Sequence, residues 1–348
     1  MTLENANHHR VASEPLLKDL LRDVSRSFYL TLRILPKPVR PQIGLAYLLA
    51  RATDTIADTG AVPVEQRIAA LGDLRRRILA PTMERIEWPE LRAHQSSPAE
   101  RTLLERINEA LALLFQFAPP DRELIQRVLS IISEGQELDL LRFGRASREN
   151  IAALNSDEEL HDYTYRVAGC VGEFWTRICV AHLRPKPGVE TEILLERGIR
   201  FGRGLQLVNI LRDIPVDLAN GRCYLPWPAL RIIGLEPTDL LNPANEPKLR
   251  PVYNEWLKSA EGHLATAWQY VLELPRSWWR VRLACAWPVL IGFRTLDLLK
   301  TGNVLNPDTR LKVSRREIKS ILWRSIVRYP SERAWARLPG VVSDSGIG

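Results

Sequence analysis

The chain has 348 residues, of which 45% are apolar and 26% charged. That balance is typical of a globular protein and excludes collagen-like, low-complexity and largely disordered classes. Forty-eight Lys and Arg residues against 41 Asp and Glu give a net charge of +7, which favours anionic partners such as diphosphates, nucleic acid or acidic lipid.

No targeting or membrane-spanning segment is predicted. The N-terminal stretch MTLENANHHRVASEP is polar and lacks the apolar core of a secretory signal. The longest strongly apolar run, residues 283–293, is flanked by arginines and is too short to span a bilayer. The 4 cysteines show no zinc-binding spacing, which favours free thiols in a reducing cytosol. We therefore expect a cytoplasmic protein that is soluble or peripheral at the inner membrane surface.

Apolar residues recur with helical spacing along most of the chain, and alternating β-type patterns are nearly absent. Pro- and Gly-rich breaks near 117–121, 184–188, 219–228 and 234–247 are typical of loops between helices. The pattern predicts an all-α fold with one domain over residues 1–338 and a frayed tail over 339–348. The expected helices cover residues 16–24, 43–57, 65–80, 100–117, 121–143, 157–183, 190–214, 250–273, 281–300 and 314–328.

The first candidate site is the segment RATDTIAD, residues 51–58. Asp54 and Asp58 are four residues apart on a predicted helix, so their carboxylates lie on one face and repel each other unless a cation intervenes. Carboxylates suit Mg²⁺, which binds through one or two of them together with substrate phosphates. Arg51, one turn earlier, supplies a guanidinium that pairs with phosphate. A single motif of this kind is also typical of a solvated helix end.

The second candidate site is a polar stripe on an otherwise apolar helix. Gln206, Asn209, Asp213 and Asp217 follow one another at steps of three and four residues. Buried polar groups of this kind are costly without partners, which metal ions and a diphosphate would supply. Pro215 interrupts the pattern, because it lacks the N–H of a helical bond, and it predicts a kink or a helix end at that point.

Two acidic turns, each beside an arginine (Arg51 and Arg212), are far more specific than either alone. Helical bundles commonly build metal sites from facing carboxylates, and we expect the two turns to face each other. The chemistry that this arrangement suits is the Mg²⁺-assisted loss of diphosphate in a cavity that excludes water.

Together with three further motifs, these segments resemble the squalene/phytoene synthases. The matching segments cover roughly residues 20–228 in the family's order, with a weaker match to about 325: SRSF (25–28), RATDTIAD (51–58), YTYRVAGCVG (163–172), LQLVNILRDIPVD (205–217) and GRCYLP (221–226). The resemblance implies an isoprenoid-synthase helical bundle around a central cavity. It also implies that two prenyl diphosphates condense head to head through a cyclopropyl diphosphate.

The resemblance further implies roles for single residues. It assigns Tyr163 to proton removal or cation steering, although a helical tyrosine is more often a core residue, as we expect for Tyr165. Gln136 and Glu137 stand where the family has more apolar residues. The metal-binding carboxylates would be Asp54, Asp58, Asp213 and Asp217, and the diphosphate-binding residues Ser25, Arg26, Arg51, Asn209 and Arg212.

The DTIAD form of the first motif is most similar to bacterial squalene synthases, which act on farnesyl diphosphate and reduce the product with NADPH. Lys312, Arg315 and Arg316 are the candidate NADPH-binding residues, although a basic stretch is usually a solvated face. The alternative is a relative that does not reduce its product and makes presqualene diphosphate, hydroxysqualene, dehydrosqualene or phytoene.

Two alternatives outside this chemistry remain. One is a non-catalytic basic helical protein on a membrane surface, favoured by the basic and apolar pattern of residues 318–338 but not by the intact acidic pairs. The other is nucleic-acid binding, which rests on net charge alone and which we do not expect. The sequence does not indicate an oligomeric state.

Overall fold

The computed structural model describes residues 19–25, 29–183, 190–309 and 311–344, and nearly all of its regular structure is helical. This confirms the predicted all-α class. The described residues form two compact units. The first contains the chain up to Gly144 and the second half of helix α11, and the second contains the remainder, with α11 divided between Thr176 and Arg177.

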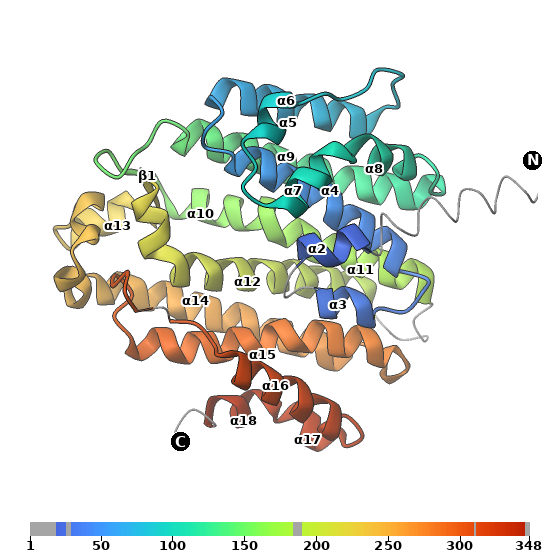
Figure 1. Cartoon of the computed structure of the whole chain (residues 1–348). Coiled ribbons are helices and arrows are strands. Elements are labelled where there is room, and N and C mark those ends of the chain that lie inside the picture. Colours follow the sequence, from blue (N-terminus) through green and yellow to red (C-terminus); the bar gives the residue numbers. More distant parts are fainter. Residues whose placement is uncertain (1–18, 26–28, 184–189, 310, 345–348) are drawn as a thin grey trace, which may run out of the picture. The chain divides into compact units, whose positions relative to one another are not determined.

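In the first unit, three long helices pack against one another: α4, α5 and α9 (Figure 1). The helix α4 begins with a proline in its first turn and is apolar along most of its length, so it is largely buried. The elements of this unit are α2 (Leu21–Ser25), α3 (Tyr29–Ile34), α4 (Arg40–Asp58), α5 (Val64–Leu79), α6 (Pro89–Ala93), α7 (Pro98–Glu105), α8 (Ile107–Leu114) and α9 (Pro119–Phe143).

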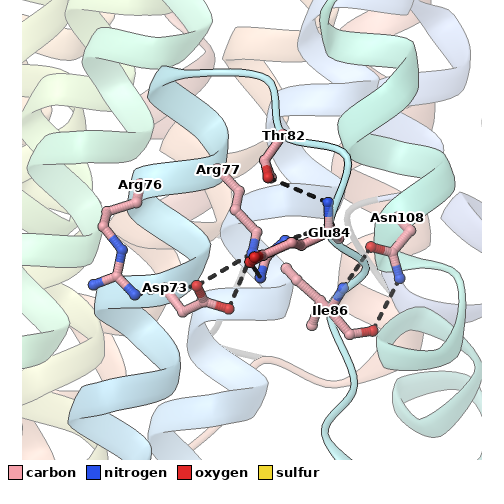
Figure 2. Close-up of polar contacts among 7 residues, drawn as sticks. All are labelled: Asp73, Arg76, Arg77, Thr82, Glu84, Ile86 and Asn108. Atoms are coloured by element: carbon pink, nitrogen blue, oxygen red, sulfur yellow. Dashed lines mark hydrogen bonds and ion pairs between the residues drawn. The ribbon is translucent and has the colours of Figure 1, made fainter.

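The loop between α5 and α6 is held by side chains of two helices, as Figure 2 shows. On α5, the Nε of Arg77 lies 3.1 Å from both carboxylate oxygens of Asp73, and the Arg77 guanidinium donates to the carbonyl of Glu84 in the loop. On α8, Asn108 accepts from the N–H of Ile86 at 2.9 Å and donates to its carbonyl at 3.0 Å. These side chains pair with backbone N–H and carbonyl groups of the loop, which have no partner within a helix.

In the second unit, the long helices α12, α14 and α15 pack side by side (Figure 1). The first elements are β1 (Ala152–Leu154), α10 (Asp157–Thr164), the π-helix η3 (Tyr165–Gly169), α11 (Cys170–Leu183), α12 (Thr191–Ala219), β2 (Arg222–Pro226) and α13 (Trp227–Ile232). The others are η4 (Pro237–Leu241), η5 (Pro243–Asn245), α14 (Glu246–Glu273), η6 (Arg276–Trp278), α15 (Trp279–Thr301), α16 (Arg315–Arg328), α17 (Glu332–Ala336) and α18 (Leu338–Asp344).

Two short parallel strands pair with each other: β2 lies in the predicted loop 219–228, and β1 lies between the helices expected at 121–143 and 157–183. The turn before β2 depends on Gly221, which has a φ of 79° and whose Cβ, if present, would lie 2.5 Å from the Ser147 nitrogen. An L-residue with a side chain rarely adopts this conformation, so glycine allows the chain to reverse after α12. As a result β2 packs against α12, the helix that carries the second acidic motif.

Glycines also allow α12 to approach the start of α11 closely. A Cβ on Gly172 would lie 1.8 Å from the carbonyl oxygen of Gly198, and one on Gly202 would lie 2.0 Å from the carbonyl oxygen of Ala168. Backbones this close leave no room for any larger residue. The predicted motif YTYRVAGCVG is therefore partly a packing motif for α12.

Two expectations about helix ends differ from the structure. The helix α12 neither ends nor breaks at Pro215 but continues to Ala219. In the tail, for which a frayed end was expected, α18 covers residues up to Asp344 and packs against α15, with Val342 only 2% exposed. The helix α18 forms because its apolar side chains are buried against α15.

Replacing Gly172 by alanine tests the close contact between α11 and α12. We expect Gly172→Ala to lower the free energy of unfolding by roughly 1–3 kcal/mol, because the added methyl group forces the two backbones apart. The control is Gly262→Ala on α14, where a Cβ meets nothing within 4 Å and the better helix propensity of alanine adds about 0.5–1 kcal/mol. Equal effects of the two variants in denaturant titrations would contradict this account.

Candidate active site

The first acidic pair lies at the C-terminal end of α4. Asp54 and Asp58 are one turn apart, and Asp58 is the last residue of the helix. Asp58 is exposed, and the side chain of Asp54 keeps 39% of its surface accessible. The C-terminal end of a helix carries a partial negative charge, so two carboxylates there are unfavourable without a cation.

The electrostatics of Asp54 reflect this crowding. Partial burial beneath the neighbouring helices, together with the nearby charges of Asp58 and Glu100, raises the pKa of Asp54 to about 7, and Arg51 only partly opposes them. The raised pKa of Asp54 shows that too little positive charge surrounds its carboxyl group. The donor set therefore suits a divalent cation.

Arg51 connects this pair to a second helix. Its guanidinium forms an ion pair with Glu100 on α7 and lies 3.8 Å from the Asp54 carboxylate. The Nε of Arg51 is buried and has no hydrogen-bond partner among the described residues. A buried donor of this kind is costly, and an anion such as a diphosphate oxygen would satisfy it.

Gln136 on α9 supports the first acidic pair directly. Its Nε2 donates to the Oδ1 of Asp54 at 2.5 Å. The polar residue that departs from the family pattern is thus a partner of the predicted metal-binding carboxylate. The Gln136 side chain, 82 positions after Asp54 in the sequence, thus fixes the orientation of the Asp54 side chain.

Of the two predicted residues near the N-terminus, the structure describes Ser25. Ser25 is 3% exposed, and its hydroxyl donates to the Leu21 carbonyl of its own helix at 2.5 Å. The Ser25 hydroxyl is thus engaged with its own helix. Arg26 lies outside the described residues.

The second acidic pair lies near the C-terminal end of α12. Asp213 accepts two hydrogen bonds from Arg212, from its Nε at 2.8 Å and from its Nη2. Asn209, one turn earlier, is exposed, and Asp213 is half-buried. The neighbouring apolar residues of the helix (Leu207, Val208, Ile210 and Leu211) are buried, so the helix presents a polar stripe, as predicted.

Asp217 lies near a tyrosine of β2 that is itself stacked on a second tyrosine. Asp217 and Tyr224 of β2 line one small cavity. The rings of Tyr224 and Tyr163 are stacked with their centroids 4.8 Å apart, and the Tyr163 hydroxyl donates to the Tyr224 hydroxyl at 3.3 Å. In the second unit, the structure therefore brings Tyr163 next to the strand that borders Asp217.

The three predicted nucleotide-binding residues lie at the start of α16. Lys312, Arg315 and Arg316 are all exposed. The first turn of α16 is capped by Ser314, whose hydroxyl accepts from the N–H of Glu317 at 3.2 Å. The cluster has the charge to attract a phosphate group, and its own helix start is already capped.

The Mg²⁺ prediction fits the chemistry of the donors on α4 and α12. Within the ranges that the structure describes, no three His, Cys, Asp or Glu side chains gather into a site able to hold a metal alone. Mg²⁺ takes one or two carboxylates and completes its shell with water and substrate phosphates. Paired aspartates beside an arginine match that mode of binding.

Sequence reasoning missed three functional candidates: Tyr224, Gln136 and Glu100. Tyr224 lies in the recognised segment GRCYLP, but nothing local in the sequence pairs it with Tyr163. Gln136 was visible only as a departure from the family pattern. Glu100 lies on a separate short helix and gives no sequence signal as the partner of Arg51.

Comparisons with known proteins show the family and the fold. The family model described as "Squalene/phytoene synthase" matches residues 21–317. The presqualene diphosphate synthase of Rhodopseudomonas palustris is 32% identical over 250 residues, covering 72% of this chain and 76% of that protein. Squalene synthase ERG9 of Saccharomyces cerevisiae is 25% identical over 296 residues, covering 84% of this chain and 63% of the yeast protein. The fold matches that of TcSQS in complex with the ligand E5700 with a TM-score of 0.74 at 21% identity, over 97% of this chain and 92% of that chain.

The raised pKa of Asp54 predicts a pH-dependent effect of Asp54→Asn on stability. The folded protein holds the Asp54 proton up to about pH 7, whereas the ordinary pKa is 3.8. The stabilisation from that proton is present at low pH and is lost as the pH rises through this window. Asparagine does not ionise, so the melting temperature of Asp54→Asn should rise relative to wild type between about pH 4 and pH 7 in metal-free buffer.

Asp58→Asn provides the control, since it removes a charge that raises the pKa of Asp54. In that background, the gain from Asp54→Asn should be smaller. Parallel melting curves for wild type and Asp54→Asn across the pH series would show that Asp54 is not perturbed.

Proposed function

Because the chain belongs to the squalene/phytoene synthase family, we propose that it condenses two molecules of farnesyl diphosphate head to head into presqualene diphosphate. The carbon chains are joined through a cyclopropane ring, and one diphosphate and one proton leave. The observation that carries the proposal is the repetition of an acidic pair beside an arginine at the C-terminal ends of α4 and α12. The relative from Rhodopseudomonas palustris supports the product.

The residues of the two helices bind the diphosphates. Asp54 and Asp58 on α4, and Asp213 and Asp217 on α12, are the residues that would hold Mg²⁺. Bound Mg²⁺ neutralises the negative charge of the departing diphosphate. The guanidiniums of Arg51 and Arg212, together with the exposed amide of Asn209, donate to diphosphate oxygens.

Tyr163 and Tyr224 act on the hydrocarbon part of the substrate in this proposal. Stacked aromatic rings present electron-rich faces that attract a carbocation. The hydroxyl–hydroxyl contact of 3.3 Å fixes the two rings relative to each other and links Tyr163 to the strand next to Asp217. We assign to Tyr163 the steering of the cation and the removal of the proton.

NADPH-dependent reduction to squalene is the second candidate function. In that step a hydride from NADPH quenches the cation formed as presqualene diphosphate loses its remaining diphosphate. The observation that favours it is the exposed basic cluster of Lys312, Arg315 and Arg316 at the start of α16, which suits a nucleotide phosphate.

We also propose that α16 contacts an anionic lipid surface. No helix in the described ranges is long and apolar enough to cross a membrane. The face of α16 opposite its buried Ile321 exposes Trp323, Ile326 and Val327, at 67%, 48% and 55%. Five basic side chains and a single acidic one lie on the same helix, and that acid, Glu317, is paired with Arg294. An exposed apolar face with a basic surround is typical of a helix that lies in the lipid headgroup region.

Incubation of the purified protein with farnesyl diphosphate and Mg²⁺ tests the condensation. We expect presqualene diphosphate from the wild type. Asp54→Ala and Asp213→Ala should lower turnover by about three orders of magnitude, because each removes several kcal/mol of charge stabilisation from the leaving group. Product formation is followed by extraction and mass spectrometry.

The matched control is Asp73→Ala, which removes an aspartate on α5 that is paired with Arg77 (Figure 2). That variant should keep its turnover. Wild-type turnover in either site variant would rule out the metal role, and the absence of any condensed product from the wild type would overturn the proposed function.

Two variants of the α16 region separate its two proposed roles. Substituting Lys312, Arg315 and Arg316 together by serine should abolish squalene formation with NADPH while presqualene diphosphate accumulates. Substituting Trp323 and Ile326 by serine should weaken sedimentation with phosphatidylglycerol vesicles at least about tenfold, because two apolar anchors are lost. This second variant should keep any NADPH-dependent product.

Squalene yields that are unaffected by the basic substitutions would place the nucleotide elsewhere. A wild type that makes no squalene with NADPH would establish a non-reducing synthase. Vesicle binding that is unchanged in the Trp323 and Ile326 variant would remove α16 as the lipid contact.

A further inference from the structure

The continuity of α12 through Pro215 requires a partner for a backbone group that proline leaves unpaired. Proline has no N–H, so the carbonyl of Leu211, four residues earlier, receives no helical hydrogen bond from position 215. Pro215 lies midway between Asp213 and Asp217. The carbonyl of Leu211 therefore lies two residues before Asp213, at the start of the segment that carries the second acidic pair.

A side chain from the neighbouring helix takes the place of that missing bond. The hydroxyl of Tyr253 on α14 donates to the carbonyl oxygen of Leu211 at 3.1 Å. Tyr253 is 0% exposed, as is Leu211, so water does not compete for the carbonyl. Burial raises the pKa of Tyr253, which keeps its hydroxyl protonated and able to donate.

Tyr253 is itself held firmly in place. The guanidinium of Arg250 lies over its ring, 5.2 Å from the centroid. Arg250 donates to the carbonyls of Leu299 and Gly302, at 2.8 Å and 2.5 Å, and forms an ion pair with Glu246. The end of α15 thus fixes Arg250, Arg250 covers the ring of Tyr253, and the hydroxyl of Tyr253 reaches α12.

We propose that Tyr253 is a positioning residue for the acidic pair on α12. Its hydroxyl replaces the hydrogen bond that Pro215 cannot make and keeps Asp213 and Asp217 one helical turn apart on a single face. Because it concerns the same acidic pair, this inference rests on the proposed function. Tyr253 does not contact the substrate and acts through the backbone of α12.

A double-mutant cycle tests the proposal, with Mg²⁺ and inorganic diphosphate as the ligand in titration calorimetry. Tyr253→Phe should weaken binding about tenfold, the effect expected when a buried carbonyl loses its hydrogen bond. Pro215→Ala restores an N–H that can bond to Leu211. In that background, Tyr253→Phe should therefore change the affinity less than about twofold, because the cycle isolates the shared hydrogen bond.

The matched control is Tyr270→Phe, also on α14. Tyr270 is 2% exposed, and its hydroxyl is hydrogen-bonded to Thr176 at 3.0 Å, away from the acidic pair. This variant should lower the melting temperature and leave diphosphate affinity unchanged. A drop in affinity as large as that in Tyr253→Phe would overturn the proposal, because loss of any buried hydroxyl on α14 would then suffice.

Three further outcomes decide the matter. An equal loss of affinity from Tyr253→Phe in the wild-type and Pro215→Ala backgrounds would overturn the proposal, as would the absence of any Mg²⁺-diphosphate binding by the wild type. Coupling in the cycle supports it. Failure of the wild type to turn over farnesyl diphosphate would count against the proposed function alone, because the binding cycle is read without turnover.

Discussion

The constraint on which the site depends is that two helices must hold paired carboxylates at their negative ends. On α4 and α12 the acidic residues lie in the last turns, where the helix dipole opposes them, and the other faces of both helices are buried. Neighbouring helices support the two acidic motifs in different ways. On α9, Gln136 donates to the carboxylate of Asp54, and on α14, Tyr253 donates to the backbone carbonyl of Leu211.

The two pairs balance their charge differently. On α4, Arg51 is shared with Glu100, so Asp54 remains short of positive charge and its pKa is raised to about 7. On α12, Arg212 is committed to Asp213 through two hydrogen bonds. The first pair is thus left short of positive charge, whereas Asp213 of the second pair already holds an arginine. The same motif therefore has a different charge balance on each helix.

Local pattern predicted the long helices and the polar stripe, because both depend on residues three and four positions apart. It failed where a partner lies far along the chain. Of the kink or helix end expected at Pro215, the helix end was wrong: α12 continues to Ala219, and Tyr253 donates to the carbonyl of Leu211, 42 positions earlier in the sequence. The strands β1 and β2 were missed because their pairing depends on the turn at Gly221 and not on a β-type pattern. Gln136 and Tyr224 became candidates only through their contacts with Asp54 and Tyr163, which the sequence does not show.

The location of the supporting residues explains why a proline can persist inside a site helix. A residue that breaks one hydrogen bond is tolerated when a rigid neighbour replaces that bond, and the Arg250–Tyr253 contact provides such a neighbour. The replacement is a side-chain bond, so its strength depends on how α14 packs against α12 and not on α12 alone. The spacing of Asp213 and Asp217 is thereby tied to the packing of the second unit, and a change in that packing reaches the acidic pair through one hydroxyl group.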